Sequence, residues 1–385
     1  MKTRLQPLAL LLLLPLAAHA QVNSGSDGHD GAFNPTTNTV INMADHPNGI
    51  YHYTSVNISN AVTVTFIPNA NNTPVVWLVQ SNVVINGIVN VSGQSGDVTV
   101  GGIGGPGGWK GGIGGEASTA GQGPGGGQPK TSTSSFGGNA SFGAAGFYLS
   151  GAGAGAVGQI YGNPFLVPLL GGSGGGGGTT GGGGGGGAIL IAASGEITAN
   201  GQIRAYGGSS YPAGGGSGGA IRLVTSKFSG SGNLGASGGS GSYGNGLAGK
   251  GRIRLDVYEN TFGGGLDGVF TQGFQPIIIP TAGQGAQLNI TSVGGVPVSA
   301  SPTGTFTTPD AILSAQQNNP IPVVVHCSNI PLNTQITVSV RPANGVTVSA
   351  TGYNNSGTLS SSTATISITM PRGGGIIYAM AATGN

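Results

Sequence analysis

One apolar pattern recurs three times in this chain at a spacing of 32 residues, beginning at Gly187, Gly219 and Gly251. Within each copy, apolar residues alternate with other residues over short stretches, and the stretches are separated by turn-forming pairs such as Ser194-Gly195. Alternation with a period of two predicts short β-strands that bury every second side chain. A fixed period of this length predicts that copies of one structural unit stack on each other.

The first copy shows the predicted unit in most detail. It contains three apolar pairs, which are Ile189 with Ile191, Ile197 with Ala199, and Ile203 with Ala205. Three short strands per unit, each followed by a turn, favour a parallel coil in which the inward side chains form a continuous core. The sequence therefore predicts an all-β protein: a right-handed parallel β-helix-like solenoid with glycine-rich insertions, followed by a smaller immunoglobulin-like β-sandwich.

Changes in composition divide the chain into four parts. Residues 1–20 have the features of a signal peptide, with Lys2 and Arg4 before an apolar run and a small-residue cleavage site that ends at Ala20. Residues 21–49 are expected to form an N-terminal cap, and residues 50–275 the glycine-rich β-solenoid. Residues 286–385 contain less glycine and show six alternating runs, which is typical of an immunoglobulin-like sandwich. The segment 277–280 would join these two parts.

Glycine supplies 81 of the 385 residues, but without the strict every-third spacing that collagen requires. Three tracts are especially rich in it, at 101–128, 137–158 and 171–187. These tracts are either flexible insertions or extended segments with three residues per turn, whose backbones pack closely and hydrogen-bond to each other. The second interpretation is favoured, because stacking of the strand units would place the tracts side by side.

The charge content excludes several partner classes. Only 6% of the residues are charged, and removal of Lys2 and Arg4 leaves ten basic residues against ten acidic ones. No basic stripe is present to neutralise phosphates, so nucleic acid is not an expected partner. After the signal peptide no apolar run is long enough for a transmembrane segment. The single cysteine, Cys327, cannot form an intramolecular disulfide and is expected in the core.

The chain resembles a group of glycine-rich exported bacterial proteins of unassigned function over residues 22–260. The resemblance rests on Ser24-Gly25-Ser26-Asp27-Gly28, on Gly31-Ala32-Phe33-Asn34-Pro35, on the strands expected at 56–58 and 62–66, and on the repeated Gly-Ala-Ile units. Residues 286–385 are similar to immunoglobulin-like modules at the ends of bacterial surface proteins. Neither resemblance implies a catalytic residue.

The densest group of metal-ligating residue types is Asp27, His29 and Asp30, with His46 and His52 further along the chain. Carboxylates and imidazoles of this kind can hold a calcium or transition-metal ion. They can equally form a capping loop in which the Asp side chains bond to nearby backbone amides. The capping loop is favoured, because the acidic spacing is not repeated as it is in calcium-loaded solenoids, and so no metal and no cofactor is predicted.

A polysaccharide-degrading site would need paired carboxylates, or a carboxylate with a cation. The candidates are Asp97, Glu116, Glu196, Asp256, Asp267, Lys110, Arg204, Arg222 and Arg254. The simpler interpretation is a solvated row of charges that keeps one face of the coils soluble. No catalytic residue is therefore predicted.

Aromatic residues in or beside the glycine-rich loops are the remaining functional signal. They are Trp109, Tyr148, Tyr161, Tyr206, Tyr211 and Tyr243. Their flat rings could stack on sugars or on another surface, or they could hold the loops against the coils.

These observations predict a secreted or surface-associated structural or adhesive protein without catalysis. Its expected partners are extracellular polysaccharide, matrix or cell-surface components. One alternative is a polysaccharide-active β-helix enzyme, either a lyase or a hydrolase. A second alternative is an ice- or mineral-binding protein, which the alternation of Thr63 and Thr65 favours.

Overall fold

The computed structural model describes residues 22–131, 136–148, 154–241, 246–273, 286–299, 302, 308–343 and 345–382. The predicted signal peptide and its cleavage site lie outside the described residues, as do the segment 277–280 and Tyr243. The described part is all-β apart from η1, a single turn of 3-10 helix at Met43–Asp45. No helix among these residues is both long and apolar enough to cross a membrane.

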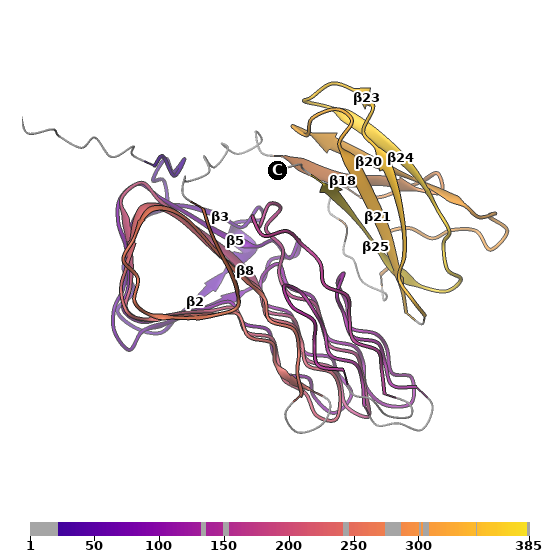
Figure 1. Ribbon diagram of the computed structural model, residues 1–385, viewed down its shortest axis with the longest axis horizontal. Coiled ribbons are helices and arrows are strands. Elements are labelled where there is room, and N and C mark those ends of the chain that lie inside the picture. Colours follow the sequence, from indigo (N-terminus) through magenta and orange to yellow (C-terminus); the bar gives the residue numbers. More distant parts are fainter. Residues whose placement is uncertain are drawn as a thin grey trace, which may run out of the picture.

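Two parallel sheets build the N-terminal part, and Figure 1 looks along the direction in which their strands stack, so that the strands lie one behind another around a closed outline. The larger sheet has nine strands and the smaller sheet has six. The larger sheet contains β1 (Gly31–Phe33), β3 (Ile50–Ile58), β5 (Val75–Val79), β6 (Val83–Ile85), β8 (Ala188–Ala193), β9 (Glu196–Ala199), β11 (Ala220–Ser229), β15 (Arg252–Asn260) and β17 (Val269–Gly273). The smaller sheet runs in the order β16 (Gly265–Asp267), β12 (Asn233–Gly235), β10 (Gln202–Arg204), β7 (Ile88–Asn90), β4 (Thr63–Ile67) and β2 (Thr39–Asn42).

The predicted solenoid of three short strands per coil is wrong as a fold class. Strands β3 and β11 are long, and each pairs with two successive neighbours, so that the parallel pairing β3-β5-β8-β11-β9-β6 returns to β3 and closes a six-stranded ring. The cause is local: Ser194-Gly195 separates β8 from β9, whereas β11 has Thr225-Ser226 at that level and stays extended. Without a glycine the chain does not turn, and one strand spans both pairings.

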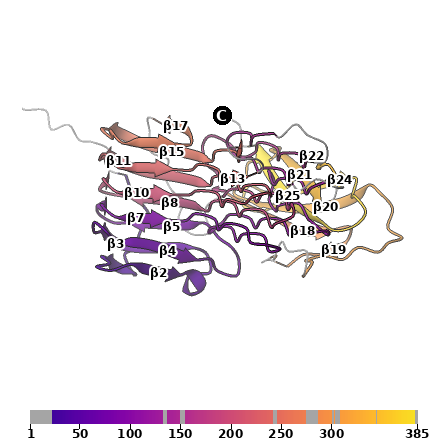
Figure 2. The same cartoon turned by 90° about the horizontal axis from the view of Figure 1, so that it is seen from below.

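The 32-residue spacing does set the register between strands. Ile189 pairs with Ile221, and Ile221 pairs with Ile253, so equivalent residues of the three copies lie in one column. All three side chains are fully buried in the main hydrophobic core. Figure 2 shows β5, β8, β11, β15 and β17 stacked in this order.

The glycine tracts form an ordered array beside the strands, and the hydrogen bonds reveal a repeat of three residues. The N–H groups of Gly182 and Gly185 donate to the carbonyls of Gly112 and Trp109, which belong to one neighbouring tract. The next residue of each turn bonds to a second neighbouring segment, since Gly183 and Gly186 donate to the carbonyls of Gly214 and Ser217. The third residue bonds to another segment, since Gly184 and Gly187 donate to those of Gln94 and Val91. Three directions that recur every third residue are the property of an extended helix with three residues per turn.

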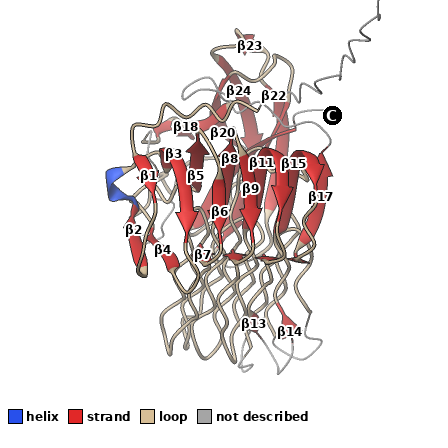
Figure 3. Ribbon diagram, turned by 90° about the vertical axis from the view of Figure 1, so that its left-hand side faces the viewer, coloured by secondary structure: helices blue, strands red, loops and turns tan. Residues whose placement is uncertain are grey.

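The segment 181–187 also accepts hydrogen bonds from three further extended segments, through the N–H groups of Gly102, Gly175 and Gly208. It therefore lies in the middle of the array, surrounded by backbone. The described residues of the tracts are ordered, as the favoured interpretation of the sequence proposed. Figure 3 shows the array as parallel loops that run away from the strands toward β13 (Ser240–Gly241) and β14 (Gly246–Leu247).

The C-terminal part consists of antiparallel sheets over a second core that includes Val323, Val338 and Ile366. The six alternating runs of the sequence are all strands. Their pairing gives a five-stranded and a three-stranded antiparallel sheet in place of the predicted immunoglobulin-like sandwich. Alternation specifies which residues face a core, whereas strand order depends on partners far along the chain. The five-stranded sheet runs β19 (Val296–Pro297), β18 (Gln287–Val293), β20 (Ile321–Ser328), β24 (Ser362–Ile368) and β23 (Ser356–Gly357), and the three-stranded sheet runs β22 (Val348–Tyr353), β21 (Gln335–Pro342) and β25 (Gly375–Ala382).

Candidate binding surface

The end of the glycine array farthest from the strands gathers turns that are distant in sequence. The turn 97–100 adjoins two other tracts, since Gly181 donates to the Asp97 carbonyl and Gly114 to the Thr99 carbonyl. On the next turn, Thr180 Oγ1 lies 3.3 Å from Ser210 Oγ. Backbone pairing thus fixes the turns beside one another.

Apolar side chains on these turns are exposed instead of packed. Tyr211 and Tyr148 are 64% and 58% exposed, and the ring of Tyr211 lies 6.3 Å from that of Phe136. The neighbouring edge is held by the N–H of Phe147, which donates to the carbonyl of Leu247. We call the exposed apolar residues at this end the tip surface; they are Val98, Val100, Ile113, Phe147, Tyr148, Tyr211 and Leu247.

The tip surface carries little net charge. Lys130 lies 3.8 Å from the carboxylate of Glu116, and the carboxylate of Asp97 accepts a hydrogen bond from the N–H of Val98. An exposed apolar group on a solvated protein points to an interaction site when it is clustered. Its chemistry suits a ligand without a strong charge.

The structure separates the six predicted aromatic residues into different roles. Tyr148 and Tyr211 are on the tip surface, and Tyr243 lies outside the described residues. Tyr161 instead holds the array together: it is buried, stacks on Phe142 at 4.5 Å, and donates from its hydroxyl to the carbonyl of Gly171 at 2.6 Å. Burial raises the pKa of this phenol well above its usual value.

Trp109 and Tyr206 also lie against the protein. Trp109 is half-buried with its ring 6.0 Å from that of Tyr161. The ring of Tyr206 lies across Gly235 on a neighbouring strand, where a Cβ atom would come within 2.3 Å of it. Trp109, Tyr161 and Tyr206 therefore hold loops against the protein, whereas Tyr148 and Tyr211 are exposed.

Sequence reasoning missed the aliphatic and phenylalanine members of the tip surface. Val98, Val100, Ile113, Phe147 and Leu247 are not Tyr or Trp, the residue types whose amphipathic rings indicate a sugar-binding surface. A usable signal exists: each is a large apolar residue in a glycine-rich segment outside the alternating strands.

The candidate carboxylates do not form one group among the described residues. Glu196 and Glu259 flank Lys227 at 3.9 and 3.7 Å in an exposed row. Asp267 lies 2.7 Å from Lys250, whose hydrogen bond lowers the pKa of that carboxyl. These pairs are the solvated contacts that the simpler interpretation expected.

Arg222 and Arg254, however, are not part of a solvated row. Both are buried and bind the fully buried carboxylate of Asp256, with Arg222 Nε 3.0 Å from Oδ2 and Arg254 Nη2 2.7 Å from Oδ1. The segment around Phe165 covers this face of the strands: the Arg254 guanidinium lies 5.3 Å from that ring, and Leu166 belongs to a buried cluster with a residue of β11. The expectation was wrong because a segment distant in sequence folds over the outward face of the strands.

The alternation of Thr63 and Thr65 is not continued by threonines on the neighbouring strands. Along the smaller sheet, Thr63 aligns with Ile88, then Gln202, Asn233 and Gly265. A regular ladder of threonines is therefore absent from this face of the described sheet.

The N-terminal cap brings Asp27, His29, Asp30, His46 and His52 together. His29 Nδ1 lies 2.6 Å from Asp27 Oδ1, and His46 Nε2 lies 3.2 Å from Asp30 Oδ1. Hydrogen bonds from the amide and ring of His29 lower the pKa of Asp27, and the same carboxylate raises the pKa of His29. The sequence proximity of these residues therefore corresponds to a real cluster.

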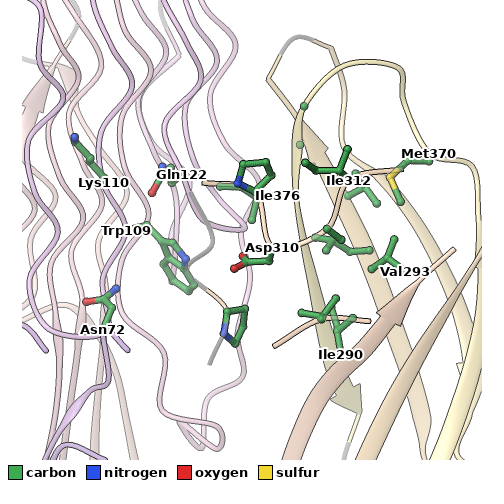
Figure 4. A pocket seen from close by; sticks show the side chains of 18 of the residues that line it. Asn72, Trp109, Lys110, Gln122, Ile290, Val293, Asp310, Ile312, Met370 and Ile376 are labelled. Carbon is green, nitrogen blue, oxygen red and sulfur yellow. The ribbon is translucent and has the colours of Figure 1, made fainter. Parts of the chain in front are cut away.

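A cavity of about 1040 Å³ lies between the glycine array and the C-terminal sheets. Figure 4 shows Trp109, Lys110 and Gln122 on the array side and apolar side chains such as Ile290 and Ile312 opposite. Its lining is mainly apolar, without a convergent set of titratable groups among the described residues. The cavity is large, but the described residues that line it do not indicate a particular ligand or reaction.

No family model, curated protein or solved structure matches this chain.

Proposed function

We propose that this chain is an exported, non-catalytic adhesive protein that binds an uncharged extracellular surface, such as a neutral polysaccharide, through its tip surface. The observation that carries the proposal is the exposure of seven large apolar side chains on turns that lie at one end of an ordered backbone array. The array would act as a rigid spacer between the strands and the bound surface.

Rigidity supports this function energetically. Binding on a flexible loop loses conformational entropy, at a cost of about 1–2 kcal/mol for each residue ordered. The turns of the tip surface are already fixed by hydrogen bonds between tracts, such as those of Gly114 and Gly181. Only the side chains would then lose freedom, and Tyr and Phe have few rotatable bonds.

The chemistry of the tip surface favours sugar rings over charged ligands. Aromatic rings present flat apolar faces, and the phenol hydroxyls of Tyr148 and Tyr211 add hydrogen-bonding groups at the edge of the patch. The nearby Lys130 and Glu116 are paired with each other and supply no net charge. An ionic polysaccharide would find no complementary field here.

The test is a binding experiment on insoluble neutral polysaccharides and on a glycan array. The replacements Tyr148→Ala and Tyr211→Ala each remove one exposed ring, and we expect each to weaken binding by about 2- to 12-fold, as for aromatic contacts of about 0.5–1.5 kcal/mol. Tyr258→Ala is the matched control, because Tyr258 is 46% exposed but lies on β15. Equal loss in the control, or full binding by both tip variants, would refute the proposal.

The same incubation tests the enzyme alternative. New reducing ends or unsaturated products that accumulate with time would show that the protein cleaves polysaccharide. That outcome would replace the adhesive function by catalysis.

A further inference from the structure

Three imidazoles and two carboxylates converge in the N-terminal cap from three separate segments. Asp27, His29 and Asp30 lie in a turn, which Gly28 enables by adopting a φ of +75°. His46 follows η1, where its N–H donates to the Met43 carbonyl. His52 is on β3, and its N–H donates to Asp30 Oδ2 at 2.6 Å. The cluster is therefore held by the backbone as well as by its own side chains.

One set of three donor atoms matches the spacing of a metal coordination shell. The Asp30 carboxylate lies between two imidazole nitrogens, with His46 Nε2 at 3.2 Å from Oδ1 and His29 Nε2 at 3.6 Å from Oδ2. The ligand atoms of these three residues all lie within 4.8 Å of one another. Ligands bound at about 2.0–2.1 Å in a tetrahedron are about 3.3 Å apart, so small adjustments would suffice.

The surroundings orient these ligands as in known metal sites. His29 is bonded through Nδ1 to Asp27 at 2.6 Å, which leaves Nε2 toward Asp30. A carboxylate on the second nitrogen of a metal-bound imidazole fixes the ring and its tautomer. The rings are also stacked, His29 on His52 at 4.7 Å and His46 on Tyr51 at 4.1 Å, which restricts their rotation.

We propose that His29, Asp30 and His46 bind one divalent transition-metal ion of the zinc class, with Asp27 as the residue that positions His29. Two nitrogen ligands and one oxygen ligand suit Zn²⁺, Cu²⁺ or Ni²⁺, whereas calcium takes oxygen ligands only. Because three protein ligands leave room for a fourth, the ion stays open to water or to an outside group. The site is independent of the proposed adhesive function.

The test uses the chain purified without a histidine tag and freed of metal with EDTA. Titration with Zn²⁺, followed by calorimetry, should give one ion per chain. His29→Ala and His46→Ala should each weaken binding at least tenfold, and His326→Ala, which removes an imidazole in the C-terminal part, should leave it unchanged. His29 is 57% exposed, so its replacement should not disturb folding, and a Zn²⁺-dependent rise in the thermal midpoint provides a second measure of binding.

The test of Asp27 must distinguish the positioning of His29 from a general structural role. Asp27→Asn should weaken Zn²⁺ binding by about 10- to 100-fold, as second-shell changes do, and Asp27→Glu should restore part of it. Co²⁺ bound to the wild-type chain should give the intense visible bands of tetrahedral coordination, and His29→Ala or His46→Ala should abolish them.

Three results would overturn the assignment. The first is no Zn²⁺ binding at millimolar concentration. The second is binding that survives both His29→Ala and His46→Ala. The third is binding that survives His46→Ala but is lost in His52→Ala, because the ligands would then be the other group of donors, Asp27, His29 and His52.

Discussion

Gly182 and Gly175 lie so close that a Cβ atom on Gly182 would be 2.1 Å from the carbonyl oxygen of Gly175. No side-chain atom can lie that close to another atom. The oxygen that it would meet belongs to the backbone, which cannot rotate away as a side chain can. The same holds along the whole tract, where Gly183 would meet the Gly208 carbonyl at 2.0 Å. Glycine is thus required here for close packing of neighbouring chains.

Gly182→Ala should therefore destabilise the array strongly, by about 2–4 kcal/mol, as overpacking of a rigid interior does. Gly263→Ala is the control, because a Cβ there has open space; it should change stability by about 0.5 kcal/mol or less. The measurement is urea unfolding followed by tryptophan fluorescence. Both tryptophans, Trp77 and Trp109, belong to the N-terminal part of the chain, so the fluorescence change follows the unfolding of that part. Equal midpoints for the two variants would contradict the packing argument.

A second prediction concerns the two faces of β10. Ile203 is fully buried, whereas Arg204 on the same strand is only partly buried and bonds through Nε to Gln202 Oε1. Ile203→Asp places an unpaired carboxylate in the core and should cost several kcal/mol, about 3 or more. Arg204→Asp should cost about 0.5 kcal/mol. Similar unfolding midpoints for both variants would mean that the faces are assigned wrongly.

A third prediction concerns the buried carboxylate of Asp256. Asp256→Ala leaves the guanidinium groups of Arg222 and Arg254 buried without their partner, which should destabilise the protein by about 3–5 kcal/mol. Glu196→Ala removes a carboxylate that is half exposed, and it should cost less than about 1 kcal/mol. A thermal unfolding curve distinguishes them; a stable Asp256→Ala protein that had lost an activity would instead assign Asp256 to chemistry.

Asp267 should contribute to stability in a defined pH range. Hydrogen bonds from Lys250 and Ser237 lower the pKa of this carboxyl below its unfolded value near 3.8. Its contribution is therefore present above that value and disappears as the pH falls through the lower folded pKa. Because Asp267 is partly exposed, the contribution should be below about 1 kcal/mol. Asp267→Asn should be less stable than the wild type at pH 6, and the difference should shrink as the pH falls below 3.8; a difference that stays constant with pH would argue against this origin.

The sequence determined the strands and their inward residues, because alternation is a local property. Ile189, Ile221 and Ile253 could be aligned from the 32-residue spacing alone, and the structure places them in one buried column. The possible metal ligands Asp27, His29 and Asp30 were also visible, since they are adjacent in sequence. Ring closure through β3 and β11 was not predicted, because it depends on which strands pair along two halves of a long strand.

Only the tertiary structure decided what the glycine tracts and their neighbours do. A glycine has no side chain to indicate a partner, so the sequence cannot specify that Gly182 bonds to Gly112 while Gly183 bonds to Gly214. The same applies to Arg222, which looked solvated until a segment far along the chain covered it, and to Tyr148 and Tyr161, equally aromatic but exposed in one case and buried in the other. Burial depends on which segments of backbone meet in space, and in a glycine array that is set by hydrogen bonds between distant tracts.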